Sequence, residues 1–244
     1  MEQLKTILAA LLLLCSTVAT AHDFEVDGIY YNIQSQEEKT VEVTYEGDRP
    51  YGNYWGNVRI PASVTYKGTT YSVTTIGNYA FSDCSSLTSV VIPNSVTTIG
   101  EEAFVYCSSL ASIEIPNSVT TIGTWAFNGC SSLTSIEIPN SVRTIGYSAF
   151  GDCSSLTSIE IPNSVTTIEA GVFIGCYGLT NITVDENNLA YDSRNNCNAI
   201  IETASNTLVS GCQSTIIPNS VTTIGVEAFE YCSSLTSRLV LSTT

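Results

Sequence analysis

Apolar and polar residues alternate along the chain in a unit that repeats every 23 residues. One copy spans 119–141 and reads VTTIGTWAFNGCSSLTSIEIPNS, and its neighbours differ from it at only a few positions. The apolar residues that recur at this spacing are Phe81, Phe104, Phe127, Phe150 and Phe173, with Cys84, Cys107, Cys130, Cys153 and Cys176 and Leu87, Leu110, Leu133, Leu156 and Leu179. A fixed period predicts a solenoid of stacked coils, because one unit cannot bury its apolar side chains alone.

Each unit divides into three short elements. The L-x-x-I-x-I segment, as at 133–138, has the alternation of a half-buried strand and ends at a proline, which cannot donate to a sheet. The V-T-T-I-G segment predicts a second extended piece that ends in a turn glycine. The A-F-x-x-C segment places Ala126, Phe127 and Cys130 at helical spacing. That spacing predicts a single helical turn with Phe and Cys pointing inward.

Two coils are longer than the others, and further strands precede the first coil. VTYKGTTYSV, around Lys67 and Gly68, and NAIIETASNTLVSG at 198–211 predict hairpins within the long coils. FEVDGIYYNI has a hairpin turn signal at Asp27 and Gly28, and KTVEVTYEG can pair with it. We therefore divide the chain into a signal peptide (1–21), an N-terminal β cap with the first long coil (22–72), regular repeats (73–184), a long coil with a hairpin insert (185–220) and a last, incomplete repeat (221–244).

The first residues have the pattern of a secretory signal peptide. Lys5 precedes an apolar run at 7–15, and the Ala-Thr-Ala that ends at Ala21 fits a small-x-small cleavage site. The run is too short for a transmembrane helix, which needs about 20 residues. A lipoprotein acylated at Cys15 is the weaker alternative, because Leu14 is bulky where a small residue is required. We expect cleavage after Ala21, a secreted or cell-surface location and no membrane span.

Charge and composition exclude several classes of function. The chain has 23 acidic residues against 8 basic ones and a formal net charge of −15. Such a surface repels phosphate, which excludes nucleic acid and a basic membrane-surface role. Its one histidine, His22, excludes nearly all Ser-His-Asp, Cys-His and His-rich metal sites. Because no nucleophile elbow, phosphate loop or zinc spacing is present, we expect no enzyme, no cofactor and no metal.

One column of exposed strand positions carries in-register charge. Between the two inward residues of each L-x-x-I-x-I segment, successive coils place Val91, Glu114, Glu137, Glu160 and Thr183. Coils spaced at about 4.8 Å bring the three glutamates close enough to repel unless a cation or basic partner neutralises them. The functional interpretation is a contact stripe for a basic patch, with a weak calcium ladder as a minor alternative. The simpler interpretation is an ordinary solvated strand face.

Aromatic residues cluster beside the A-F pair. Tyr106, Trp125 and Tyr147 are the candidates for binding there, because exposed aromatic side chains are the usual anchors of protein and carbohydrate interfaces. Packing over the neighbouring coil is the alternative for each of them. Trp125 is the best single candidate for a contact.

The cysteines call for two interpretations. Those in register with Cys130 are predicted to be buried thiols that pack as small apolar residues. A hairpin with its turn at Ala204 and Ser205 instead places Cys197 opposite Cys212. In an exported chain these two could form a disulfide that staples the hairpin, and both states of the pair stay open.

Over residues 58–237 the unit L-x-x-I-x-I-P-x-S-V-x-x-I-G-x-x-A-F-x-x-C-x-x-L resembles the 23-residue leucine-rich repeat of the BspA-like type. The resemblance implies a leucine-rich repeat solenoid with a continuous parallel β-sheet, short helical or turn segments and an N-terminal β cap. It also implies a secreted or surface protein of a host-associated bacterium. Such a protein binds host extracellular-matrix proteins, host cell-surface proteins or the surface of another microbe.

The repeat pattern breaks at its last copy. After Leu235, Arg238 takes the first apolar place, and Leu239 and Leu241 restore the alternation one residue late. We expect an uncapped sheet edge there, which invites pairing with another chain. Two functions therefore stand beside protein binding. One is a structural or assembly component that self-associates through its C-terminal edge, and the other is a carbohydrate-binding surface protein that uses the exposed aromatic residues.

Overall fold

The computed structural model describes residues 22–49 and 51–232. Its strands are β1 (Phe24–Val26), β2 (Ile29–Ser35), β3 (Thr40–Thr44), β4 (Gly56–Arg59), β5 (Ser63–Tyr66), β6 (Thr69–Ile76), β7 (Leu87–Val91), β8 (Thr98–Ile99), β9 (Thr121–Ile122), β10 (Thr144–Ile145), β11 (Ser158–Ile161), β12 (Thr167–Ile168), β13 (Asn181–Val184), β14 (Tyr191–Asp192), β15 (Ala199–Glu202), β16 (Thr207–Gly211) and β17 (Thr223–Ile224). One short 3₁₀ helix, η1 (Arg194–Asn196), precedes β15. The expected signal peptide and the irregularity at Arg238 lie outside the described residues.

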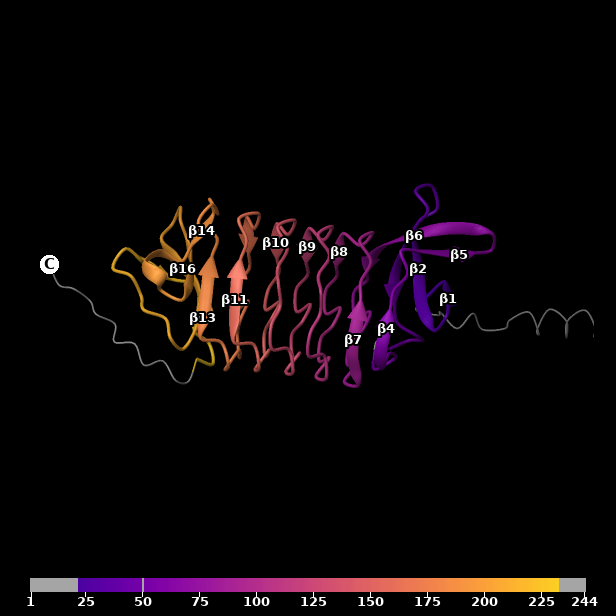
Figure 1. Cartoon of the computed structure of the whole chain (residues 1–244), viewed down its shortest axis with the longest axis horizontal. Coiled ribbons are helices and arrows are strands. Elements are labelled where there is room, and N and C mark those ends of the chain that lie inside the picture. The colour runs from indigo at the N-terminus through magenta and orange to yellow at the C-terminus, as the bar shows by residue number, and fades with distance from the viewer. Residues whose placement is uncertain (1–21, 50, 233–244) are drawn as a thin grey trace, which may run out of the picture.

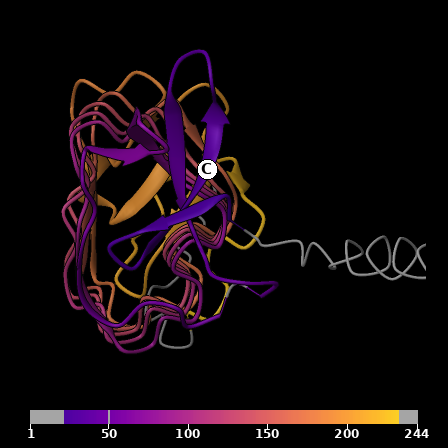
Figure 2. The same cartoon turned by 90° about the vertical axis from the view of Figure 1, so that its right-hand side faces the viewer.

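The coils stack side by side into an elongated solenoid, as the repeat predicts (Figure 1). Strands β1 to β6 lie at one end and the sheet of β14 to β17 at the other. Viewed along the long axis, the middle coils superimpose on one another (Figure 2). Among the described residues, no helix is long or apolar enough to cross a membrane.

The V-T-T-I segments form the continuous parallel ladder of the solenoid. Strands β6, β8, β9, β10 and β12 pair in this order, and each strand is shifted from the last by one repeat, so that Ile99 lies opposite Ile122 and Ile122 opposite Ile145. These isoleucines are fully buried. Within the described residues, the L-x-x-I-x-I segments form regular pairs only between β4 and β7 and between β11 and β13.

Like charges contribute to this difference between the two ladders, although the junction between Val91 and Glu114 also lacks regular pairing. Where the L-x-x-I-x-I segments pair regularly, the exposed residues opposite each other are Arg59 and Val91, or Glu160 and Thr183. Between these pairs, Glu114 and Glu137 occupy the same position of coils that have no assigned strand there. Like charges directly opposite each other destabilise neighbouring strands. The glutamate column therefore weakens the sheet that carries it.

The A-F-x-x-C segment forms successive turns rather than the single helical turn that its spacing predicts. Each copy holds two residues with left-handed backbone, for example Trp125 (φ 52°) and Gly129 (φ 74°). This geometry directs three backbone N–H groups toward the next coil, where the N–H groups of Trp125, Phe127 and Gly129 each donate at 2.8 Å to the carbonyl oxygens of Tyr147, Ala149 and Gly151. A helical turn would point these donors along its own axis instead. The turns thus add a further ladder between the coils.

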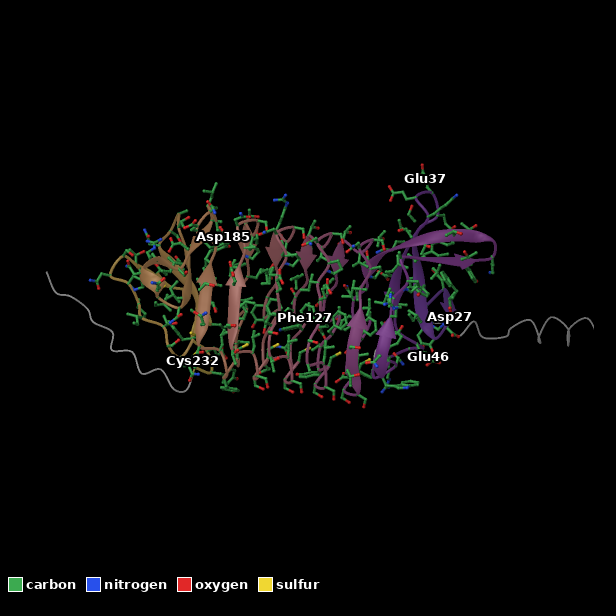
Figure 3. The ribbon with its side chains drawn as sticks, in the orientation of Figure 1. Asp27, Glu37, Glu46, Phe127, Asp185 and Cys232 are labelled. Atoms are coloured by element: carbon green, nitrogen blue, oxygen red, sulfur yellow. The ribbon has the colours of Figure 1, made fainter. Side chains whose placement is uncertain are left out.

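The core of the solenoid is a stack of phenylalanine rings. The rings of Phe81, Phe104, Phe127, Phe150 and Phe173 lie 5.0–5.8 Å apart and nearly parallel. Phe127 lies inside the middle of the stack (Figure 3). Beside the rings, the Cys130 thiol donates a hydrogen bond to the carbonyl oxygen of Phe104 at 3.2 Å. The cysteines of this column are buried or half-buried free thiols, as expected, and Cys107, Cys153 and Cys176 form the same bond in their coils.

Tyr54 closes the phenylalanine stack at the N-terminal end. Its ring packs on Phe81 at 4.6 Å between centroids. Its hydroxyl donates to the Thr44 carbonyl oxygen at 2.5 Å and accepts the Tyr30 backbone N–H at 3.1 Å. Its own backbone N–H donates to the Cys84 sulfur at 3.4 Å. Tyr54 therefore joins strands β2 and β3 to the first coil.

At the other end, a tyrosine ends the ladder of V-T-T-I strands. The backbone N–H of Ile168 in β12 donates to the Tyr191 hydroxyl at 2.9 Å, where a further strand would otherwise accept it. Strands β14 to β17 form a separate sheet. Arg194 holds this sheet together, because it binds Asp192 at 2.7 Å through Nε and Asn206 at 2.7 Å through Nη1.

Candidate functional site

The predicted glutamate column lies on the outside of the solenoid. Glu114, Glu137 and Glu160 are exposed at the same position of three successive coils. The residues on either side of Glu137 along the chain, Ile136 and Ile138, are buried. This alternation of buried and exposed residues is the one that the sequence pattern predicts.

Two of these glutamates line a groove together with an aspartate that the repeat pattern does not predict. The groove has a volume of about 440 Å³ and contains Glu137, Glu160 and Asp185. Polar residues line most of the rest of it: Ser135, Asn140, Ser158, Asn181 and Thr183. Glu114 does not line it. Asp185 follows β13, where other coils have a proline, and that exchange is the signal that could have found it (Figure 3).

The carboxylates of this acidic groove have no cationic neighbour. None of its lining residues is Lys or Arg. The single ion pair among the described residues joins Arg194 to Asp192, at another place in the fold. The part of the chain that the structure describes has no group of three or more His, Cys, Asp or Glu side chains arranged to hold a metal ion. The groove thus offers exposed anionic oxygens and small hydroxyl groups to a partner with basic side chains.

The three candidate aromatic residues lie in the turn segments, on another side of the coil from the glutamates. Trp125 is 37% exposed, and its ring meets Tyr147 edge-on at 5.7 Å. The Tyr147 backbone N–H donates to the Glu169 carboxylate at 2.8 Å, and the nearby Glu227 carboxylate raises the pKa of the Tyr147 phenol. Contacts with neighbouring coils therefore account for much of the surface of this pair.

Tyr106 also packs over the next coil while remaining 54% exposed. A Cβ atom at Gly129 would lie only 2.4 Å from Cδ1 of Tyr106. Gly129 also has φ 74°, which glycine adopts without strain, and the tyrosine ring leaves no room for a Cβ atom there. The structure does not bring the aromatic residues into the acidic groove, so the candidate residues form two separate surfaces.

The predicted pairing of Cys197 with Cys212 is wrong in register. Strands β15 and β16 form a hairpin, but a bulge between Ile200 and Ile201 shifts their pairing by one residue. Continuing that register places Cys212 beside Asn198, whose carbonyl oxygen accepts the Cys212 thiol at 3.5 Å. A shift of one residue moves a side chain to the other face of a strand, and the two cysteines accordingly belong to different apolar clusters. Both are free thiols.

Comparison with protein families identifies this repeat. The model of the BspA type leucine rich repeat region matches residues 74–201 and 199–243 in six copies. The chain belongs to this family. As a BspA-type leucine-rich repeat protein, it has the strand-rich repeat fold of a class of proteins that bind other proteins. A comparison with functionally curated proteins finds no match.

Solved structures support the same fold. A leucine-rich repeat protein from Bacteroides ovatus ATCC 8483 is 31% identical with a TM-score of 0.61, over 84% of this BspA-type chain and 55% of that protein. The leucine-rich repeat protein of T. pallidum is 26% identical with a TM-score of 0.60, over 83% of this chain and 81% of that protein. The pneumococcal vaccine antigen PcpA is 21% identical with a TM-score of 0.64, over 84% of this chain and 61% of that protein. At this identity the likeness supports the shared fold and nothing further. The chain thus spans about half the length of the B. ovatus protein.

Proposed function

We propose that this chain is a secreted or cell-surface protein without enzymatic activity that binds a partner protein through its acidic groove. The binding serves adhesion to host extracellular-matrix or cell-surface proteins, or to the surface of another microbe. One observation carries the proposal: Glu137, Glu160 and Asp185 share an exposed groove that has no basic side chain. In this arrangement residues 22–72 act as an N-terminal β cap, which leaves the repeats to carry the binding surface.

The chemistry of the groove favours a partner with a basic patch. Lysine and arginine side chains relieve the repulsion among the in-register carboxylates. The net charge of −15 also attracts a basic protein from a distance and speeds its association. Because exposed charges are screened by salt, binding through this surface falls as ionic strength rises.

The test is retention of the purified chain on immobilised fibronectin, fibrinogen and collagen across a salt series. Retention at low salt that falls with added salt is the expected result, and Glu137→Lys should abolish most of it. Glu37→Lys is the matched control, because Glu37 is an exposed glutamate in the turn between β2 and β3, remote from the groove (Figure 3). Excess chelator should leave the retention unchanged. An absence of retention at every salt concentration contradicts the proposal.

A second candidate function is self-association through the edge of β17. Among the residues that the structure describes, this strand is the last of its sheet, and Ile224 within it is 46% exposed, although the equivalent Ile145 is fully buried. Val226, just beyond, is 73% exposed. Sedimentation across a concentration series should show a dimer, which Ile224→Glu should dissociate. Strictly monomeric behaviour of the unaltered chain at high concentration would rule the candidate out.

A further inference from the structure

A second cavity lies at the N-terminal end of the solenoid. Its apolar lining comes from the β1–β2 hairpin, the chain that follows β4, and the end of β7: Val26, Ile29, Tyr31, Ile60, Pro61, Ala62, Val91 and Pro93. The cavity has a volume of about 490 Å³, and the two remaining lining residues, Asp27 and Arg59, are charged. It shares no residue with the acidic groove.

Tyr31 is a lining residue of this cavity that carries an unsatisfied polar group. Its side chain is fully buried, and its ring stacks on Phe24 at 5.3 Å. Its hydroxyl is buried with no hydrogen-bond partner among the residues that the structure describes. Burial, with a smaller contribution from the charge of Asp27, raises the pKa of the Tyr31 phenol, which stays neutral. A buried hydroxyl without a partner costs free energy, and a ligand that supplies one recovers it.

The two charged residues lie at the exposed edge of the lining. Asp27 is exposed in the hairpin turn with φ 51°, and Arg59 is exposed at the end of β4 opposite Val91. Neither forms an ion pair with another described residue. Asp27 and Arg59 line the cavity together with Tyr31. A cationic ligand group would be attracted to Asp27 and an anionic group to Arg59, so the lining suits a partner that brings both charges.

We propose that this cavity binds a lysine side chain of a partner protein. The aliphatic stem of the lysine packs on the apolar walls, and its ammonium group donates to the Asp27 carboxylate and the Tyr31 hydroxyl oxygen. An acidic residue next to that lysine in the partner contacts Arg59. A purely apolar side chain would fill the walls but leave the Tyr31 hydroxyl without a partner. Lysine combines both properties, because it buries its stem while its charged end stays near polar groups.

The proposal depends on the proposed function only in assuming that the partner is a protein.

The test uses n-butylammonium, which has the stem and charge of lysine, and follows the methyl and aromatic NMR signals of the full chain. We expect shifts at Ile29, Ile60 and Tyr31 with a dissociation constant on the order of millimolar. Butan-1-ol, which has the same stem without the charge, is the matched ligand control and should bind at least fivefold more weakly.

Three variants separate the contributions to binding. Asp27→Asn and Tyr31→Phe should each weaken n-butylammonium binding at least threefold. Asparagine tolerates the left-handed backbone at position 27, and phenylalanine keeps the buried ring at position 31, so both variants should fold. Glu37→Gln removes a charge at the opposite side of the N-terminal strands and should leave binding unchanged (Figure 3). The methyl spectrum of each variant without ligand verifies its fold.

Several results would overturn the proposal. These are equal binding of butan-1-ol and n-butylammonium, unchanged binding by Asp27→Asn, or an absence of shifts at about 50 mM ligand. The outcome is separable from that of the acidic groove. Binding of n-butylammonium without retention on matrix proteins would leave the cavity assignment standing and refute the proposed function, and the reverse result would do the opposite.

Discussion

Removing the charge of Glu137 should stabilise the solenoid. Glu137 is exposed, has a like-charged residue at the same position of the coil on either side, and lies in a segment without a regular strand. Glu137→Gln keeps the size and shape of the side chain and removes only the charge. We expect the free energy of unfolding to rise, because the repulsion is present in the stacked coils and is relieved when the chain unfolds.

The spacing of the coils sets the magnitude. The rings of Phe104 and Phe127, one coil apart, are separated by 5.2 Å. Two unit charges about 5 Å apart in water repel by about 0.8 kcal/mol, and Glu137 takes part in two such pairs, with Glu114 and Glu160. Screening is slight at an ionic strength of about 0.01 M, where the gain should be about 1.4 kcal/mol, and it falls to about 0.3 kcal/mol at about 1 M.

Urea unfolding suits this test because urea is uncharged and leaves the ionic strength free to vary. The midpoint should shift without a change in slope. Glu114→Gln is the matched control: Glu114 has one glutamate neighbour and Val91 on its other side, so its effect should be half as large. A gain that does not shrink with salt, or equal gains for the two variants, would refute the assignment to in-register repulsion.

Three further predictions concern the ends and the core. Tyr54→Phe should lower the free energy of unfolding by about 1–3 kcal/mol in urea, because it leaves buried backbone groups without partners. Burial raises the pKa of Asp192, but hydrogen bonds from Arg194 outweigh burial, and the net effect is a lowered pKa. Asp192→Asn should therefore lower the free energy of unfolding at pH values above the ordinary pKa of 3.8. This loss should shrink as the pH falls through the folded-state pKa. Burial raises the pKa of the Cys130 thiol to about 12, so peptide mass spectrometry should find it unlabelled by iodoacetamide at a pH of about 8 until urea unfolds the chain. The first prediction fails if Tyr54→Phe is as stable as the unaltered chain, and the second fails if the loss of stability in Asp192→Asn does not change with pH. The third fails if iodoacetamide labels Cys130 rapidly in the folded chain.

The core was predictable because burial follows the repeat. Phe127, Cys130 and Ile136 each recur every 23 residues and are buried in the structure. The left-handed turns were not predictable from Trp125 alone, since tryptophan rarely adopts that backbone. The one signal in the sequence for that position is the glycine of a single other coil, Gly171.

The candidate sites were predictable only in part. The alternation of residues placed Glu137 and Glu160 on one exposed column, but the groove also needs Asp185, from a coil that departs from the repeat. A bulge such as that at Ile200 depends on how the hairpin packs on its neighbours, and no residue type marks it in advance. The cavity at Tyr31 joins segments far apart in the chain, so no local pattern could indicate it.

The most direct test of the central claim compares the unaltered chain with a variant in which Glu137, Glu160 and Asp185 are replaced by Gln, Gln and Asn. Both are passed over the matrix protein that retains the unaltered chain best, at low and at high salt. We expect the variant to keep its fold and to lose retention at low salt, to the level that the unaltered chain shows at high salt. Equal retention of the two proteins would contradict the claim that the acidic groove is the binding surface.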